Sequence, residues 1–531
     1  MKLFIGSSPL YKSKIYIRFV FGFTLFYSIF CFGETTKKDN NHMSIFDAVK
    51  VSIQNNNNIK VTKLTSEIAK ENIQAQEGQF DYTLLTKSSI INNVQPTQLS
   101  SSGDMVGINS ESQVLTFGVQ KQLKSSAIIN LSSSIDSYQD EFSGQEFNDS
   151  SNAAVNFSLT FPLWRGRGGE ITTLPLGLSK LAFDASVFDL KYQINTSILN
   201  TVTSYWNYRG KSDSLSLLKE SENRSQSLLN EIQDLIDADE LPLSELNVVK
   251  AQLSQRKGSR YQGEKNVVEA QAALSNSLGA VYYSSSLIKP TTSLTIPPDL
   301  DFDVFPALDL SELLKKIEMV RNDFSAVNQR IDIANKQIRL AHESGKPQLN
   351  LTFGGTHKQN DQRDDLFAGL NGDSFSPDWS VQLDFKWKPQ QNSALAGSNS
   401  ARAAHQQRII ERAELRRATA VQLDSALFSY IQSGRRYQES KNRQILSKEN
   451  VENERKKLTL GSSTLLNLIN IEDRLLQSEL DVINEKINYG ITLARLMFIT
   501  GQLGKHTSNQ LNMNELLSGD LFIQRLLNGQ I

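Results

Sequence analysis

The side chains best suited to chemistry are scattered along this 531-residue chain. The five histidines have no spacing that suggests a metal site. They are His42, His342, His357, His405 and His506. No nucleophile stands in a recognisable setting with a general base. The sequence therefore predicts no catalytic, metal or cofactor site, and we expect that the protein is not an enzyme.

One glycine-rich segment, Gly166-Arg167-Gly168-Gly169, lies between a strand-like run and a helical run, where a phosphate-binding loop would lie. It lacks the full glycine fingerprint, and the strand before it is amphipathic rather than buried on both faces. We therefore interpret the segment as a joint between a sheet and a helix. The cationic run Arg412, Arg416 and Arg417, far along the chain, is expected to form a solvated helix face.

Composition and the N-terminus limit the possible roles. The formal net charge of −1 argues against a nucleic-acid partner or a polybasic membrane-surface role. A basic start and the apolar run Phe19–Phe32 predict a secretory signal, cleaved ahead of Glu34. An uncleaved anchor is disfavoured because this run is shorter than the ~20 residues that a span needs. Lipidation of Cys31, the single cysteine, is disfavoured because bulky Phe30 precedes it.

The sequence contains two copies of one unit. Each copy has an opening helix, strands that alternate apolar and polar residues, and a long helical hairpin. Repeats of this kind indicate an ancestral duplication. Three pairs of segments match between the copies. One pair consists of short polar segments, here called the polar knots. The pairs are Ile68–Ile73 with Ile333–Ile338, the polar knots Asn55–Asn58 with Arg321–Asp323, and Leu274–Gly279 with Leu496–Gly501.

Prolines mark the joints between these parts, because proline is excluded from helix interiors and central strands. Pro96 and Pro377 are expected in polar loops. The predicted parts are a signal (1–33), an opening helix (34–79), strands with an extra hairpin (80–174), a helical hairpin (175–285), a linker (286–308), a second opening helix (309–345), strands (346–389), a second hairpin (390–503) and a tail (504–531).

Apolar residues in the hairpin regions recur with helical spacing, as Ile194, Ile198 and Val202 do. Each long helix, about 65 to 70 residues, would reach roughly 100 Å. No single globular core is that long, so the helices must pack sideways as coiled coils. The returning arms are predicted over Ser244–Leu278 and Thr464–Thr500.

The strand regions alternate apolar and polar residues with period two. Runs near ten residues with one apolar and one wet face fit a transmembrane β-barrel, and no later apolar run is long enough for a helical span. The side chains expected to face lipid are Phe157, Leu159, Phe161, Val381, Leu383, Phe385 and Trp387. Trp164 and Trp387 would suit an aromatic girdle. A soluble antiparallel sheet packed on helices is the alternative.

Two strands per repeat, or four in the first, cannot close a barrel, since about eight are needed. The chain must therefore oligomerise to hide its strand edges. The predicted fold class is an α+β membrane protein, in which coiled-coil hairpins form an α-barrel and the protomers share one β-barrel.

Several segments resemble the TolC-like outer-membrane efflux protein family over essentially the whole mature chain. Phe46–Val49 with Asn55–Asn58 is similar to the opening helix of the family, and Phe161–Gly168 to a strand-end motif. Leu241–Leu246 and Leu458–Ile469 resemble the two hairpin tips. The resemblance implies a homotrimer whose tips dock on a periplasmic adaptor and an inner-membrane pump. The tip residues that it implies are Glu240, Leu241, Pro242, Leu243, Ser244, Gly461, Ser462, Ser463, Thr464 and Leu465.

The sequence departs from the family at the periplasmic gate. Well-known members close the mouth with aspartates just after the second tip, whereas the matching positions here are Asn467 and Asn470. Asp473, three residues on, could partly replace that acidic ring, because i, i+3 positions share a helix face.

The favoured function is an outer-membrane exit duct that extends into the periplasm of a Gram-negative-type envelope, for efflux or type I secretion. The first alternative is a periplasmic coiled-coil tether that does not span the membrane. The strands with Phe and Trp on one face argue against it. The second is a diffusion porin, which the long hairpins disfavour because porins have short periplasmic turns. The cargo, and the particular adaptor and pump, cannot be read from the sequence.

Overall fold

The fold is described from a computed structural model of the chain. The structure describes residues 42–98, 105–142, 145–282, 287–294, 296, 309–361, 366–367, 370 and 374–503. The predicted signal with Cys31, the predicted tail over 504–531 and most of the predicted linker lie outside the described residues.

Each predicted opening helix is in fact two helices. In the first half α1 (Ile45–Asn55) is followed by α2 (Asn57–Glu77) and a 3-10 turn, η1 (Gly78–Phe80). In the second half α6 (Leu310–Val320) is followed by α7 (Asn322–Ser344). The break is at the polar knot in both halves.

Side chains at these breaks explain them. Ser44 begins α1 with a capping box, in which Ser44 and Asp47 satisfy one another's backbone N–H groups. Asn56 ends α1 and caps α2, because its side-chain oxygen accepts the N–H of Asn58 at 2.9 Å. At the second break the guanidinium of Arg321 is held by Asp323 at 2.6 Å.

A left-handed glycine packs against each break. Gly279 follows α5 (Ser244–Leu278) with φ 66°, and a Cβ added there would lie 2.7 Å from the carbonyl oxygen of Asn55. Gly501 follows α9 (Leu465–Ile499) with φ 74° and lies against Val320 and Arg321. Glycine is required at the first position for both its backbone conformation and its close approach.

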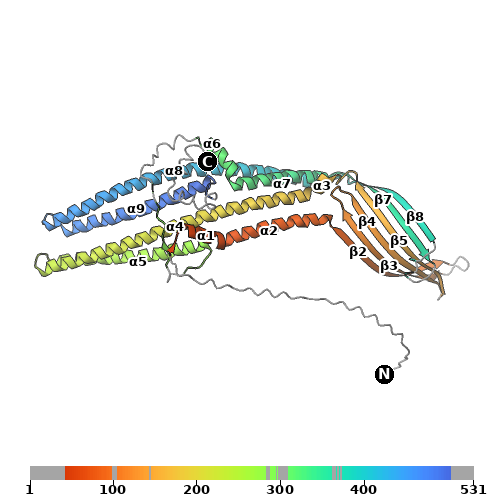
Figure 1. Ribbon diagram of the computed structural model, residues 1–531, viewed down its shortest axis with the longest axis horizontal. Helices are drawn as coiled ribbons and strands as arrows, with labels where there is room; N and C mark the ends of the chain where they lie inside the picture. The colour runs from red at the N-terminus through yellow and green to blue at the C-terminus, as the bar shows by residue number, and fades with distance from the viewer. Residues whose placement is uncertain are drawn as a thin grey trace, which may run out of the picture. The chain divides into compact units, whose positions relative to one another are not determined.

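Two very long helices run through the helical part of the structure. They are α4 (Leu174–Asp237), of 64 residues, and α8 (Asn392–Thr459), of 68 residues. A short α3 (Gly169–Thr172) precedes α4. α5 returns along α4 and α9 returns along α8, as predicted, and α4 also packs on α9 (Figure 1).

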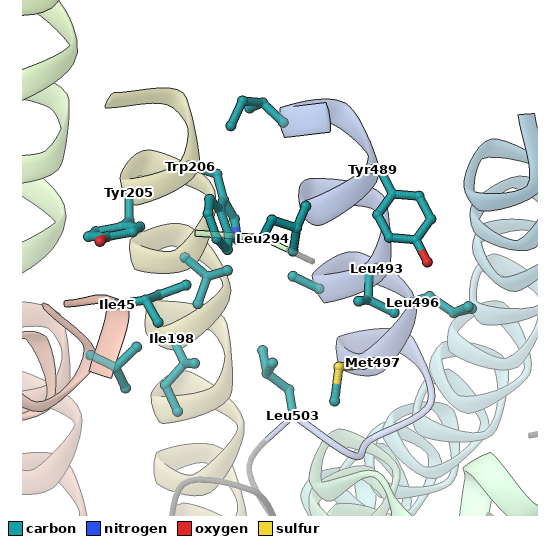
Figure 2. Packing of buried hydrophobic residues seen from close by; sticks show 14 of the residues in the cluster. Ile45, Ile198, Tyr205, Trp206, Leu294, Tyr489, Leu493, Leu496, Met497 and Leu503 are labelled. Atoms are coloured by element: carbon teal, nitrogen blue, oxygen red, sulfur yellow. The ribbon is translucent and has the colours of Figure 1, made fainter. Parts of the chain in front are cut away.

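The main core lies where α1, α4, α5, α6, α8 and α9 meet. Figure 2 shows Trp206 of α4 beside Leu294 and Tyr205 on the other side of α4, with Tyr489, Leu493 and Met497 on α9. The hydroxyl of Tyr205 donates to the carbonyl of Met43 at 3.0 Å, so this buried polar group is satisfied. Met43 belongs to β1 (His42–Met43), which pairs in parallel with β6 (Lys289–Pro290).

The larger sheet has six strands in the order β2-β3-β4-β5-β7-β8, and every neighbouring pair is antiparallel. Four strands come from the first half and two from the second, so the extra hairpin predicted for the first half is present. Their bounds are β2 (Tyr82–Gln98), β3 (Met105–Gln122), β4 (Ile128–Phe142), β5 (Gln145–Pro162), β7 (Gln348–Asp361) and β8 (Ser374–Lys386).

One expectation about local structure is wrong. Pro96 and Pro377 do not lie in loops but within β2 and β8. These are the two edge strands of the sheet, where a residue without a backbone N–H is tolerated. Arg412, Arg416 and Arg417 have exposed side chains, as expected of a solvated helix face, and Arg412 and Arg416 also contact Glu318 of α6, at 3.3 Å and 2.5 Å.

Candidate functional site

One face of the six-stranded sheet is mainly apolar across all six strands, with Lys121 of β3 and Thr86 of β2 among its few polar members. The register places Leu159 of β5 opposite Ile129 of β4 and Phe353 of β7, and Phe353 opposite Val381 of β8. The next apolar row on this face contains Leu84, Val119, Leu131 and Phe157. All the side chains expected to face lipid on β5 and β8 therefore lie on one face, because alternate residues of a strand share a side.

The half of this face nearer the helices has no cover within the described part of the chain, whereas Ile135 and Ala153 further along it are buried and Ser151 donates to the carbonyl of Leu366. Leu383 and Phe385 are 62% and 60% exposed, although both are large and apolar. Phe157, Phe161, Val381 and Trp387 are also exposed, and Leu159 is partly buried. An uncovered apolar surface of this extent indicates contact with a partner or with lipid.

The opposite face is mainly polar, although Leu85 and Ile91 of β2 also lie on it, and its polar side chains form hydrogen bonds between strands. Asn130 donates to Ser158 at 3.2 Å, and the hydroxyls of Thr160 and Thr352 lie 3.0 Å apart. Such side chains prefer water or one another to hydrocarbon, so the two faces are suited to different surroundings. Among the described helices, none is both long enough and apolar enough to cross a membrane.

The first hairpin tip joins α4 to α5 between Asp237 and Ser244. Asp239 has φ 64°, and the N–H of Glu240 reverses the chain by donating to the carbonyl of Leu235 at 2.9 Å. The predicted tip residues Glu240, Pro242, Leu243 and Ser244 are exposed. Leu241 is only half-exposed, because it packs on the apolar cluster at the base of the tip.

The second tip joins α8 to α9 through Gly461. Its φ is 67°, and the N–H groups of Gly461 and Ser462 donate to the carbonyls of Leu458 and Lys457 at 3.0 Å and 2.9 Å. This is the usual glycine ending of a helix. Thr464 then caps α9 by accepting the N–H of Asn467 at 3.3 Å.

Glu454 anchors the second tip. Its carboxylate accepts the hydroxyl of Ser463 and the ammonium of Lys457, the latter at 3.3 Å. The Ser463 hydroxyl lowers the pKa of Glu454 most, and Lys457 lowers it further. Both interactions favour the charged carboxylate. Glu454 of α8 therefore fixes the turn from its helix side, while Gly461, Ser462 and Thr464 remain exposed.

The two tips share one apolar cluster. Leu465, one of the predicted docking residues, is only 5% exposed and belongs to this cluster. It is therefore placed to support the tips rather than to contact a partner. The buried members are Leu228 and Ile232 of α4, Val249 of α5, and Leu465, Leu468 and Ile469 of α9.

The predicted gate residues separate into two groups. Asn467 and Asn470 are exposed on α9, one turn apart. Asp473 instead contacts α5, where it accepts hydrogen bonds from Gln252, at 2.9 Å, and from Arg256. Arg256 is buried, so Asp473 neutralises a cation that has little access to water.

Sequence reasoning missed Arg256. It lies on the buried stripe of α5 with Val249 and Leu253, and a charge on such a stripe requires a partner. That signal could have been read from the spacing alone. The identity of the partner could not, because Asp473 is 217 residues away.

Comparison with known proteins gives the fold. No family model and no curated protein matches the sequence. Among solved structures, the CmeC outer membrane channel of Campylobacter jejuni is similar with a TM-score of 0.63 and 15% identity, over 89% of each chain. The outer-membrane channel OprN is similar with a TM-score of 0.63 and 16% identity, over 86% of this chain and 90% of that one.

The chain has the fold of these outer-membrane channels. The MtrE outer membrane channel of Neisseria gonorrhoeae, in its open state, is also similar, with a TM-score of 0.60 and 15% identity over 86% of this chain and 89% of that one. The fold is thus the one implied by the resemblance to the TolC-like family. At these identities the likeness concerns the arrangement of the backbone.

Proposed function

We propose that the chain is the outer-membrane exit duct of a tripartite efflux or type I secretion system, and that it has no enzymatic role. The observation that carries this proposal is the apolar face that continues across all six strands of a sheet joined to two long hairpins. A hydrocarbon layer would cover that face, and the polar face would line a wet passage. The hairpins would extend into the periplasm.

The duct is proposed to be a homotrimer. β2 and β8 each have one side without a strand partner in the described part of the chain. Because six antiparallel strands alternate in direction, β8 of one copy can meet β2 of the next in antiparallel order. Closure in this way removes all free strand edges. The barrel is then shared between copies, as the resemblance implies.

The tips are proposed to dock on a periplasmic adaptor connected to an inner-membrane pump. Side chains that are exposed and held by fixed turns suit such a contact, because little order is lost on binding. We restrict the docking surface to Glu240, Pro242, Leu243, Ser244, Gly461, Ser462 and Thr464, because Ser463 is partly buried and donates its hydroxyl to Glu454. Leu241 and Leu465 would keep the two tips in shape from within.

Asn467 and Asn470 are proposed to line the closed mouth as a neutral ring. Side-chain amides can hydrogen-bond across a symmetric ring without the mutual repulsion of carboxylates. Asp473 is placed beside Arg256 and would add little free negative charge to this ring.

Outer-membrane fractionation and planar-bilayer recording test the duct against the periplasmic tether. A duct should fractionate with the outer membrane, migrate differently in gels before and after heating, and conduct ions. A protein found only in the soluble periplasmic fraction, with no conductance, would support the tether instead. In-cell crosslinking at Leu243 and Ser462, followed by identification of the captured protein, tests the adaptor contact.

A further inference from the structure

A basic pocket lies at the joint between the sheet and the helices, and the duct function does not account for it. Its volume is about 540 Å³. Residues after β5, the last turns of α7 and the first part of α8 form its walls. Its basic lining residues are Arg167, Arg339, His342, Lys346 and Arg402.

Negative charge in the pocket is scarce and already engaged. Glu343 is its one acidic lining residue and is buried. Its carboxylate accepts the N–H of Gly166 at 3.1 Å and the ammonium of Lys346 at 2.6 Å. Arg339 pairs with Glu170 at 2.6 Å, outside the lining. The last turn of a helix also favours basic residues, which accounts for His342 without any ligand.

Arg167 and Arg402 are not accounted for in this way. Within the described residues no acidic side chain pairs with either, and both are exposed on the pocket wall. A guanidinium group can donate two parallel N–H hydrogen bonds to two oxygens of one phosphate or carboxylate group. Arg167, from the segment after β5, and Arg402, from α8, both line the pocket, so its lining contains two guanidinium groups whose charge no acidic side chain of the described residues neutralises.

The glycine loop beside the pocket is not itself the receptor. The N–H of Gly166 is bound to Glu343, and the N–H of Gly168 donates to the hydroxyl of Ser126 at 3.2 Å. These two N–H groups therefore fix the joint, and they place Arg167 between two anchored residues. Recognition at this position would come from side chains.

We propose that this pocket binds a phosphate group, either the headgroup of an anionic lipid or a soluble phosphate. Trp164 lines the same pocket at the end of β5, where the apolar face of the sheet ends. Tryptophan at the end of a membrane strand marks the headgroup level, where lipid phosphates lie. The lipid source rests on the proposed outer-membrane function, whereas binding of soluble phosphate does not.

The test compares lipid binding by the purified full chain in neutral detergent, measured by native mass spectrometry. The probes are phosphatidylglycerol, phosphatidylcholine and inorganic phosphate as a competitor. The test variant carries Arg167→Gln and Arg402→Gln. The control is Arg417→Gln, on the same helix as Arg402 but outside the pocket, where Arg417 pairs with Glu414 at 2.6 Å.

The double variant should bind phosphatidylglycerol roughly tenfold more weakly, as expected for lost charge-assisted contacts. The control should bind as the unaltered chain does. If the chain prefers phosphatidylglycerol to phosphatidylcholine and millimolar phosphate does not displace the lipid, the pocket is a lipid site. If millimolar phosphate displaces the lipid, the pocket is a site for a soluble anion. Equal binding by all three proteins overturns the proposal. Circular dichroism checks that each variant is folded. The phosphate measurement needs no membrane, so that measurement remains decisive if the chain proves not to be a duct.

Discussion

An arginine on the apolar face of β5 should cost stability in proportion to its depth in the membrane. The apolar residues of this face run from Val155 to Leu163, with Leu159 in the middle. Eight residue steps of about 3.3 Å give about 26 Å along the strand. A tilt of roughly 40° reduces this to about 20 Å, close to the apolar band of about 25 Å in outer-membrane barrels. Leu159 should therefore lie near the midplane.

Leu159→Arg is expected to destabilise the folded protein by about 2–4 kcal/mol per chain, and Leu163→Arg by about 0–1 kcal/mol. The first value corresponds to a folding equilibrium shifted by about 30- to 700-fold. The matched control is Ser158→Arg, adjacent to Leu159 on the same strand but on the polar face. It loses the hydrogen bond from Asn130, which is worth about 0.5–1.5 kcal/mol and can be replaced by water.

Denaturant titration in lipid vesicles, followed by tryptophan fluorescence, gives the three free energies of unfolding. The order should be Leu159→Arg as the most costly, with Ser158→Arg and Leu163→Arg both near the unaltered protein. If Leu159→Arg and Ser158→Arg cost the same, the apolar face does not contact hydrocarbon. If Leu163→Arg is the most costly, the membrane band has been placed wrongly along the strand.

Three further predictions concern the tips and the mouth. Gly461→Trp should abolish transport in cells but leave the trimer mass intact, because φ 67° is strained for other residues yet no atom lies within 4 Å of an added Cβ; normal transport would exclude this tip from docking. Replacing Asn467 and Asn470 with Asp should introduce divalent-cation block and pH-dependent conductance in planar bilayers, whereas tight block of the unaltered protein would refute a neutral ring. Asp473→Leu should destabilise by about 1–3 kcal/mol, less than a fully buried pair because the Asp473 side chain is 37% exposed, and adding Arg256→Met should restore much of this in thermal unfolding; a double variant as unstable as the single one would contradict the pairing.

The sequence predicts the hairpins and the strand faces because local rules govern both. Helical spacing, the tip proline and glycine, and the absence of proline over long stretches predict α5 and α9 closely. Period-two alternation places Phe157 and Phe385 on one face without any knowledge of strand order. These signals depend on near neighbours in the chain, so a single sequence carries them.

Features that depend on distant pairing could not be predicted. Polar residues around Pro96 resemble a loop, and only the position of β2 at the sheet edge makes a proline there acceptable. Leu465 reads as part of an exposed tip, and its burial depends on Leu228 and Val249 of the other hairpin. The pairing of β5 with β7, which joins the strands of the two halves into one sheet, has no local signal at all.

Helix geometry explains why Asp473 does not continue the row of Asn467 and Asn470. Successive residues of an α-helix turn by about 100°, so a step of three residues leaves a deviation of about 60°. One step keeps Asn467 and Asn470 close to one face, but two steps carry Asp473 about 120° away from Asn467. At that angle it meets α5 and is neutralised by buried Arg256. The i, i+3 rule holds for one step and fails for two, so the exposed row near the tip contains amides. If this row lines the mouth as proposed, divalent cations should block only weakly.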